Sequence, residues 1–343
     1  MESIIIRTPV TESEIRIGEA WENVSGKLPS SGVVLITDDN LKKIYGSRFP
    51  DFPVLSIRPG EESKSLETAG RLSAEIMDLG IDRSGFILAI GGGVVSDLAG
   101  FIASIYMRGI RCGYVSSSLL SQVDASTGGK NGVNLGGVKN ILGVIRQPEF
   151  VICDPRMLLS LSEDEYLSGM AELIKTAIIG DTELFGILEE QYAEIKSRNV
   201  DLLELLVTRA VRFKARVVTE DEDEKGLRRI LNFGHTFGHA FEAGLAIKHG
   251  FAVASGMVLA SAFSVEKGFC SEEDNFRIIS LLKKFGFQLK QAVTPGMMEK
   301  LILHDKKKAG SDIFFVFNKG IGDATFMKIP VGELSHFYSR QNI

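Results

Sequence analysis

A short apolar segment at residues 86–90 runs directly into Gly91-Gly92-Gly93 and then into a second apolar segment at residues 94–107. The first segment is bounded by glycine and is typical of a strand buried in a parallel sheet. The second is long enough for a helix. A strand, a glycine turn and a helix N-terminus together offer an anion site suited to a pyrophosphate. The pattern therefore predicts a nucleotide-binding α/β fold, although it departs from the G-x-G-x-x-G fingerprint.

Two earlier segments have the same strand character. Residues 33–37 form an apolar, β-branched run that ends at Asp38, and residues 54–57 lead towards Glu61 and Lys64. Ligands of open parallel sheets collect at the carboxyl ends of strands. Asp38 is therefore the acidic residue suited to a ribose, whereas Glu61 and Lys64, taken alone, could be the solvated start of a helix.

Small, hydroxyl and cationic residues are dense between residues 114 and 140. Three serines at 116–118 are followed by Gly128-Gly129-Lys130 and by Lys139-Asn140. Glycine-flanked lysines can be plain surface turns. The density of phosphate-binding residue types makes a phosphate-binding loop at least as good an interpretation.

Residues 232–243 repeat histidine, glycine and phenylalanine, each at a spacing of four. On a helix this spacing gives three stripes, in which the phenylalanines lie in a core and the glycines allow another backbone to approach. The third stripe is polar and is expected to face a cavity; it holds Asn232, His235, His239 and Glu242, with Arg228 one turn earlier.

The two histidines of the polar stripe could be a simple hydrogen-bonded pair. Unpaired polar groups on an otherwise apolar helix are costly to bury, however, so a metal or an anion is the favoured partner. His249 could add an imidazole, and Glu172, which shares a helix face with Lys175, could add a carboxylate. Two histidines and one glutamate with an open position predict a catalytic site for Zn²⁺ or a similar ion.

Strand signals fade after Asp154-Pro155 and helical periodicity replaces them. We therefore expect an N-terminal Rossmann-like domain at residues 1–155 and a mostly α-helical, metal-binding domain at residues 156–343. Lys214 lies on the apolar stripe of one of these helices, where a core residue is expected. It either snorkels to solvent or belongs to a site.

The chain has 343 residues, 44% of them hydrophobic, and a formal net charge of −5. This charge gives no electrostatic footprint for nucleic acid or an anionic membrane, so clustered basic residues are expected to serve a local anion. The three cysteines are far apart, and the N-terminus has no signal-peptide pattern. Asp97 interrupts the best apolar run. We expect a cytoplasmic protein that spans no membrane.

These motifs, in this order, resemble the 3-dehydroquinate synthase family of sugar-phosphate cyclases. The resemblance covers about residues 33–330 and rests on a set of motifs that is jointly specific: Gly60-Glu61-x-x-Lys64, Gly91-Gly-Gly-Val-Val-x-Asp97, Met107-Arg108-Gly109, Gln122-Val-Asp124, Gly128-Gly-Lys130, Lys139-Asn140, Ala171-Glu172-x-Ile-Lys175, Lys214, Gly226-x-Arg228, Asn232-x-Gly-His235-Thr-x-Gly-His239, His249-Gly250 and Asp305-Lys-Lys307.

The resemblance implies a role for each matching residue. It implies metal binding by Glu172, His235 and His249, with Zn²⁺ or Co²⁺ as the ion. For NAD⁺ it implies Asp38, Asn40, Glu61, Lys64, Gly92, Gly93, Asp97, Ser117, Ser118, Lys130, Lys139 and Ser160. For the substrate it implies His239, Asp124, Lys130, Asn140, Lys175, Lys214, Arg228, Asn232 and Lys306 or Lys307, and it implies a homodimer in which Arg108 reaches the neighbouring site.

The implied substrate is 3-deoxy-D-arabino-heptulosonate 7-phosphate, whose carboxylate and phosphate explain the many cations. The implied reaction is a transient oxidation by NAD⁺, loss of phosphate, re-reduction, ring opening and aldol closure to 3-dehydroquinate. The chain departs from the family at Ser116-Ser117-Ser118, where Pro-Thr-Thr is usual, and at Asn131. Alternatives are a 2-deoxy-scyllo-inosose or epi-valiolone type of cyclase, a metal-dependent polyol dehydrogenase, and a binding protein without activity.

Overall fold

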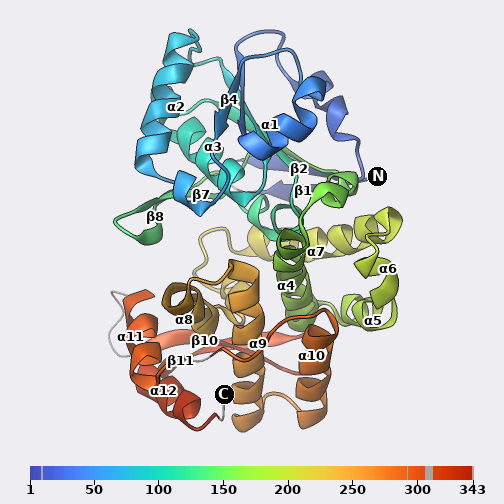
Figure 1. Cartoon of the computed structure of the whole chain (residues 1–343), viewed down its shortest axis with the longest axis vertical. Helices are drawn as coiled ribbons and strands as arrows, with labels where there is room; N and C mark the ends of the chain where they lie inside the picture. The colour runs from blue at the N-terminus through green and yellow to red at the C-terminus, as the bar shows by residue number, and fades with distance from the viewer. Residues whose placement is uncertain (9–10, 292, 306–311, 342–343) are drawn as a thin grey trace. The chain divides into compact units, whose positions relative to one another are not determined.

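A computed structural model describes residues 1–8, 11–291, 293–305 and 312–341 (Figure 1). The chain divides into two compact units. The first comprises Met1–Leu161 and Leu203–Asp223, and the second comprises Ser162–Leu202 and Glu224–Ile343. We expected two domains, each a single stretch of sequence, that meet near residue 155. Each observed unit instead consists of two separate stretches, because most of helix α7 (Val200–Glu220) belongs to the first unit.

The first unit is built on a seven-stranded sheet in the order β1-β2-β9-β6-β5-β3-β4. All neighbouring strands are parallel except β1 and β2. The strands are β1 (Glu2–Arg7), β2 (Glu12–Ile17), β3 (Val33–Asp38), β4 (Val54–Ile57), β5 (Phe86–Gly91), β6 (Arg111–Ser116) and β9 (Phe150–Cys153). Strand β4, which follows β3 in sequence, lies on one side of β3, and the next strand, β5, lies on its other side. A topological switch point therefore lies between β3 and β5, and ligands of such sheets bind at this point.

The predicted strands at 33–37, 54–57 and 86–90 are confirmed. Their side chains are buried: Val34, Leu35, Ile87 and Leu88 are fully covered. This is the burial that a sheet flanked by helices requires. The helices of this unit are α1 (Asp39–Tyr45), α2 (Leu66–Asp78) and α3 (Gly93–Ile105), with short 3₁₀ segments η1 (Trp21–Lys27), η2 (Gly46–Arg48), η3 (Glu61–Ser63), η4 (Tyr106–Arg108) and η6 (Pro155–Ser160), and a π-helical turn η5 (Ser121–Ala125).

Two local predictions in this unit are wrong. The segment around Lys130 is a β-hairpin, β7 (Lys130–Leu135) and β8 (Val138–Ile145), where a loop was expected; its proposed role in phosphate binding stays a prediction. The hairpin packs on α3. The helix after the glycine turn ends at Ile105, because Met107 and Arg108 both adopt left-handed backbone angles, with φ of 50° and 70°.

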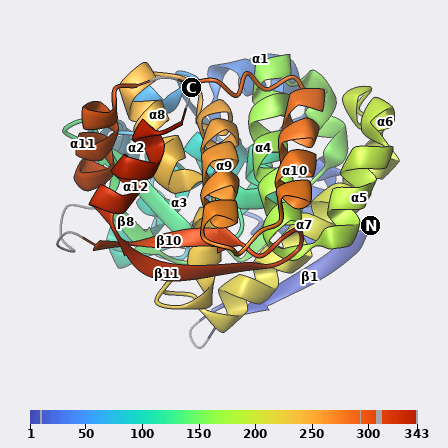
Figure 2. The ribbon, with the colours of Figure 1, turned by 90° about the horizontal axis from the view of Figure 1, so that it is seen from below.

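The second unit is mostly helical. Its central helix is α9, which is contacted by α4, α8, α10 and β10 (Figure 2). The helices are α4 (Glu163–Gly180), α5 (Thr182–Glu190), α6 (Tyr192–Lys196), α8 (His235–Leu245), α9 (His249–Glu266), α10 (Glu272–Lys284), α11 (Pro295–Asp305) and α12 (Val331–Ser339), preceded at α8 by the 3₁₀ segment η7 (Leu227–Asn232). Within the described ranges, no helix of either unit combines the length and apolar character of a membrane span.

The stripes predicted for residues 232–243 are confirmed on two of three faces. Phe233, Phe237 and Phe241 are buried, and Phe237 packs edge-on against Phe315 at 5.8 Å between ring centroids. A Cβ on Gly238 would lie 3.1 Å from the Cα of a residue on α9, so the glycine stripe does allow that helix to approach closely.

The continuous helix predicted through Asn232 is wrong. Helix α8 begins only at His235, because Gly234 adopts a left-handed conformation with φ of 77°. Arg228 and Asn232 consequently lie on the separate segment η7. A hairpin of β10 (Asp312–Asn318) and β11 (Ala324–Pro330) was also missed in the half expected to be helical.

Candidate active site

Three helices of the second unit bring the predicted metal ligands together. Glu172 comes from the middle of α4, His235 from the first residue of α8 and His249 from the first residue of α9. Oε1 of Glu172 lies 3.2 Å from Nε2 of His249 and 3.7 Å from Nε2 of His235. The three side chains each offer one atom within 4.8 Å of the others, which is the spacing of a set that can hold one ion.

Each imidazole of this set is oriented by an acceptor at its other nitrogen. Nδ1 of His235 lies 3.1 Å from the carbonyl oxygen of Phe233, and Nδ1 of His249 lies 3.1 Å from Oε2 of Glu242. A neutral ring that donates from Nδ1 has its lone pair on Nε2. Both lone pairs then point to the region beside Glu172, as metal-binding histidines require.

The glutamate is fully buried and is held by a neighbouring cation. Lys175 lies one turn further along α4, and its Nζ is 2.5 Å from Oε2 of Glu172. That ion pair is not in hydrogen-bond geometry, so this oxygen accepts no hydrogen bond among the described residues. Its other oxygen, Oε1, faces Nε2 of both histidines, and a buried carboxylate in this position is suited to a metal ion.

The electrostatics of the three groups also suit a metal. Burial alone would raise the pKa of Glu172, but the positive charge of Lys175 holds it well below its usual value. Burial lowers the pKa of His235 to about 3, so this ring stays neutral and can act as a ligand. Burial disfavours the charged form of His249, but hydrogen bonds to Glu172 and Glu242 raise its pKa to about 10. A divalent ion at Nε2 would displace one proton from it.

His239 lies beside this set. Its ring centroid is 5.2 Å from that of His235 and 6.2 Å from that of His249. With Glu242 and His249 it forms a second group of potential ligands. His239 is therefore positioned to contact a molecule bound at the first set.

The remaining predicted residues of the second unit are polar groups on α4 and η7. Lys175 and Arg228 are each 2% exposed, which is unusual for cations. Asn232 donates from Nδ2 to Oε1 of Glu224 at 2.5 Å. Lys306 and Lys307 lie outside the described residues.

In the first unit, three of the predicted nucleotide residues, Asp38, Gly92 and Gly93, lie at the switch point of the sheet. Asp38 ends β3 and caps α1, with Oδ1 accepting from the backbone N–H groups of Asn40 and Leu41. Gly92 and Gly93 follow β5 and begin α3. A Cβ on Gly92 would lie 3.1 Å from Oγ of Ser118, so this turn is already tightly approached. Pyrophosphates bind at such helix N-termini.

One polar network connects four residues predicted for the cofactor or substrate. Lys64 donates to Oδ2 of Asp97 and to Oδ1 of Asn140, both at 2.5 Å. Asn134 joins Glu61 to this group, because its Nδ2 donates to Oε1 of Glu61 at 2.9 Å and its Oδ1 accepts from the backbone N–H of Asn140. Asn140, predicted for the substrate, thus lies among the residues predicted for NAD⁺.

Lys214 is buried and paired rather than snorkelling. It is 8% exposed, and its Nζ donates to Oδ1 of Asp124 at 2.5 Å and to the backbone oxygen of Asp124 at 2.6 Å. The structure thus brings two residues predicted for the substrate into direct contact.

Other predicted residues of the first unit are placed separately. Arg108 is exposed on η4, and Lys130 and Lys139 are exposed on the β7–β8 hairpin. Ser117 is buried after β6. Ser160 accepts from the hydroxyl of Tyr45 and donates to the oxygen of Met157, each at 2.9 Å, so its hydroxyl has a structural role.

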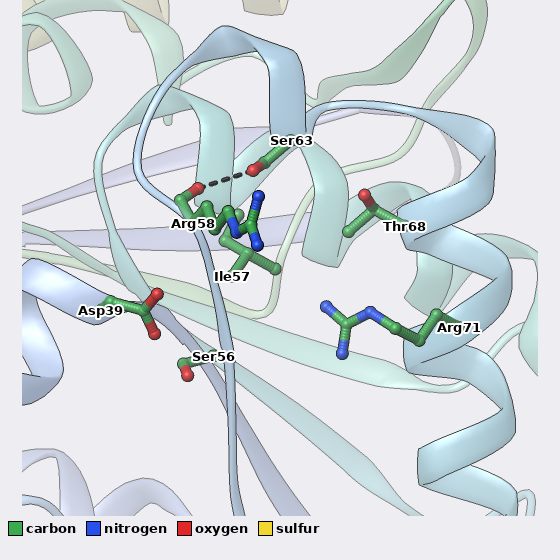
Figure 3. A pocket seen from close by; sticks show the side chains of 7 residues that line it. All are labelled: Asp39, Ser56, Ile57, Arg58, Ser63, Thr68 and Arg71. Carbon is green, nitrogen blue, oxygen red and sulfur yellow. Dashed lines mark hydrogen bonds between the residues drawn. The ribbon is translucent and has the colours of Figure 1, made fainter.

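A cavity of about 400 Å³ lies at the carboxyl ends of β3 and β4 (Figure 3). Arg58 and Arg71 point into it, with Asp39 on the opposite side. None of the residues predicted for NAD⁺ lines it, although Asp38 and Asn40 flank Asp39 in the chain. The residues that line it are Asp39, Ser56, Ile57, Arg58, Ser63, Thr68 and Arg71.

Comparison with known families is decisive at this point. Residues 54–168 match the family described as 3-dehydroquinate synthase N-terminal, and residues 169–308 match 3-dehydroquinate synthase C-terminal. The chain belongs to the 3-dehydroquinate synthase family. The resemblance inferred from the motifs is confirmed.

Similar proteins agree over nearly the whole length. The 3-dehydroquinate synthase of Dehalococcoides mccartyi (strain CBDB1) is 38% identical over 94% of this chain and 95% of its own. That of Caulobacter vibrioides (strain NA1000 / CB15N) is 40% identical over 91% and 90%. A solved 2-deoxy-scyllo-inosose synthase, in complex with carbaglucose-6-phosphate, NAD⁺ and Co²⁺, is 26% identical with a TM-score of 0.85 over 98% of each chain.

A solved 2-epi-5-epi-valiolone synthase from Streptomyces hygroscopicus subsp. jinggangensis 5008, with NAD⁺ and Zn²⁺ bound, has a TM-score of 0.87. At 24% identity over 97% of each chain it supports the fold alone. The predicted fold class, an α/β nucleotide-binding part followed by a mostly helical part, is confirmed.

Proposed function

We propose that the chain catalyses the reaction of its family, the conversion of 3-deoxy-D-arabino-heptulosonate 7-phosphate to 3-dehydroquinate and phosphate. This makes it a carbon–oxygen lyase that eliminates phosphate. The observation that carries the proposal is the convergence of Glu172, His235 and His249 in a chain that both family descriptions match. We further propose NAD⁺ and one divalent ion, Zn²⁺ or Co²⁺, as cofactors, since these accompany the solved relatives.

In this proposal Glu172, His235 and His249 hold the ion, which polarises the alcohol to be oxidised. The residues at the switch point bind NAD⁺. Gly92 and Gly93 present the N-terminus of α3 to the pyrophosphate. The other residues proposed for NAD⁺ are Asp38, Asn40, Glu61, Lys64, Asp97, Ser117, Ser118, Lys130, Lys139 and Ser160.

The proposed substrate carries a carboxylate and a phosphate, and two buried cations of the second unit are proposed to orient it. Lys175 and Arg228 are almost fully covered and belong to the same unit as the proposed metal ligands. Lys175 shares Glu172 with the proposed ion, which leaves its ammonium available to orient a substrate oxygen as well. His239, next to the proposed metal ligands, is suited to move a proton to or from the bound substrate. The other residues proposed for the substrate are Asp124, Lys130, Asn140, Lys214, Asn232 and Lys306 or Lys307.

The rival activities differ in substrate and in redox balance. A 2-deoxy-scyllo-inosose or epi-valiolone type of cyclase would act on a sugar phosphate without a carboxylate, and a polyol dehydrogenase would accumulate NADH. One assay separates them, namely phosphate release from each candidate sugar phosphate with limiting NAD⁺, with NADH absorbance followed in parallel. A binding protein without activity would release phosphate from none of them.

We propose a cytoplasmic homodimer in which Arg108 contributes to the neighbouring site. In support, Arg108 and Met107 are both exposed in left-handed conformations, which are costly for residues with side chains of this size and are kept where a function needs them. Mixing an Arg108→Ala chain with a His249→Ala chain should restore activity through hybrid dimers. Absence of any recovery, with dimers verified by light scattering, would contradict the shared site.

A further inference from the structure

The polar groups around the proposed metal site form two overlapping sets. The first is Glu172, His235 and His249, and the second is His239, Glu242 and His249. His249 belongs to both because its Nε2 lies 3.2 Å from Glu172 and its Nδ1 lies 3.1 Å from Glu242. A neutral imidazole has one lone pair and one N–H, so it can serve only one of the two sets as a ligand.

We infer that Glu242 positions His249 for metal binding through Nδ1 and is not itself a metal ligand. The inference rests on the metal site proposed above and extends it to a residue beyond the three ligands. Glu242 accepts from Nδ1–H, which fixes the tautomer whose lone pair is on Nε2 and faces Glu172. The carboxylate is well covered, with 12% of its side chain exposed.

The geometry of the neighbouring histidine supports this assignment. His235 makes the same kind of contact, with the carbonyl of Phe233 as acceptor at Nδ1 and Nε2 towards Glu172. A backbone carbonyl can only accept a hydrogen bond, so Nδ1 of His235 carries the proton and the lone pair on Nε2 faces Glu172. Coordination of an ion by the second set would use the lone pair of Nδ1 of His249 and leave the proton on Nε2, so His249 could not also bind an ion beside Glu172 and His235.

The sequence position of Glu242 follows the same logic. It lies seven residues after His235 on α8, which is two helical turns, so both side chains lie on one face. Helix α9 begins at His249, only a few residues after α8 ends at Leu245. The short connection brings the His249 ring back over this face. The stripe read from the sequence therefore contains one ligand and the carboxylate that orients the next.

The experiment measures metal binding by protein that has been stripped of metal and reloaded with Zn²⁺ or Co²⁺. Stoichiometry comes from elemental analysis, affinity from competition with a chelator, and ligand geometry from the visible spectrum of Co²⁺. We expect one ion per wild-type chain. Glu242→Gln should still bind one ion, with affinity lowered about 10–100-fold and an altered Co²⁺ spectrum.

Two further variants complete the design. Glu242→Asp keeps the charge on a shorter arm and should fall between wild type and Glu242→Gln. Glu266→Gln is the matched control, because Glu266 ends α9, about 25 Å along the helix from His249, and pairs with Arg340 at 2.8 Å. It should bind metal as the wild type does. Melting curves of the metal-free proteins show whether each variant is folded.

Three results would overturn the inference. The first is unchanged affinity and an unchanged Co²⁺ spectrum in folded Glu242→Gln. The second is two ions per wild-type chain, and the third is a Glu172→Gln chain that keeps its ion while Glu242→Gln loses it, because both would make Glu242 a ligand. A wild-type chain that takes up no ion would instead overturn the proposed metal site, and the inference with it.

Discussion

Replacing Lys214 by Met removes the ammonium group and keeps most of the apolar stem. In the structure this group donates to the carboxylate and to the backbone oxygen of Asp124. A hydrogen bond to a charged group contributes about 1.5–3 kcal/mol. Because 24% of the Asp124 side chain is exposed, water can replace part of the lost bonding. We therefore expect Lys214→Met to lower the free energy of unfolding by about 2 kcal/mol, towards the smaller end of that range.

The assay is thermal unfolding followed by calorimetry. For a unit of about 150–250 residues, ~2 kcal/mol corresponds to a fall of about 4–8 °C in Tm. The matched control is Arg212→Met on the same helix, because Arg212 pairs with Glu2 at the surface with 60% of its side chain exposed. An exposed pair contributes about 0–1 kcal/mol, so Arg212→Met should shift Tm by at most a few degrees.

A double-mutant cycle identifies the partner. Asp124→Asn alone should also destabilise, and the double variant should lose less than the sum of the two single losses, with a coupling of about 1 kcal/mol or more. The reasoning is refuted if Lys214→Met unfolds at the wild-type temperature, or if the two substitutions are additive. Lys214 would then be a snorkelling side chain, as the apolar stripe alone allows.

Three further predictions concern other parts of the chain. Asn131→Ala removes an amide that bonds the hydroxyl of Tyr114 at 2.8 Å and the carbonyls of Gly129 and Arg146 at 2.9 Å. Because this amide is expected to position the adjacent Lys130, which is proposed for the substrate, the KM for the sugar phosphate should rise several-fold with a smaller change in kcat. An unchanged KM in steady-state assays would show that Asn131 does not position Lys130. Gly256→Ala would place a Cβ 2.1 Å from the backbone oxygen of Gly234, so it should yield little folded protein, and a normally soluble, active variant would contradict the close approach of α8 and α9. Burial raises the pKa of the Cys112 thiol to about 11 and that of Cys153 to about 12, so neither should react with a thiol reagent at about pH 8 until the chain is denatured; fast labelling of the native protein would show that they are accessible.

Much of the fold could be predicted because local pattern and tertiary role agree. The strands at β3, β4 and β5 are continuous apolar runs, which only a sheet covered on both faces buries. The sequence analysis did not predict the β10–β11 hairpin. The first residues of β10 alternate between exposed and buried, as in a strand, but the helical signal of the flanking segments dominated the interpretation. The return of Leu203–Asp223 to the first unit depends on long-range packing that periodicity does not encode.

Part of the candidate site could be predicted from the spacing of residues on one helix, whereas contacts between different elements could not. Spacing on α8 placed His235 and His239 on one face, but Gly234 allows a left-handed angle that ends the helical register, and this moved Asn232 and Arg228 to η7. Glu242 appeared on the polar stripe without a role, since its partner His249 is on another helix. Asn134 could not be assigned a role from the sequence, because its link between Glu61 and Asn140 exists only in the fold.

The most direct test of the proposed function is the number of phosphate ions released per NAD⁺. The proposed reaction oxidises and re-reduces one enzyme-bound molecule with no net redox change, whereas a dehydrogenase with similar NAD⁺ and metal ligands would accumulate NADH. With the metal-loaded protein, 3-deoxy-D-arabino-heptulosonate 7-phosphate in large excess and NAD⁺ limiting, many equivalents of phosphate should be released per NAD⁺ while NADH absorbance stays flat. NADH accumulation in step with substrate consumption would contradict this account and identify a dehydrogenase.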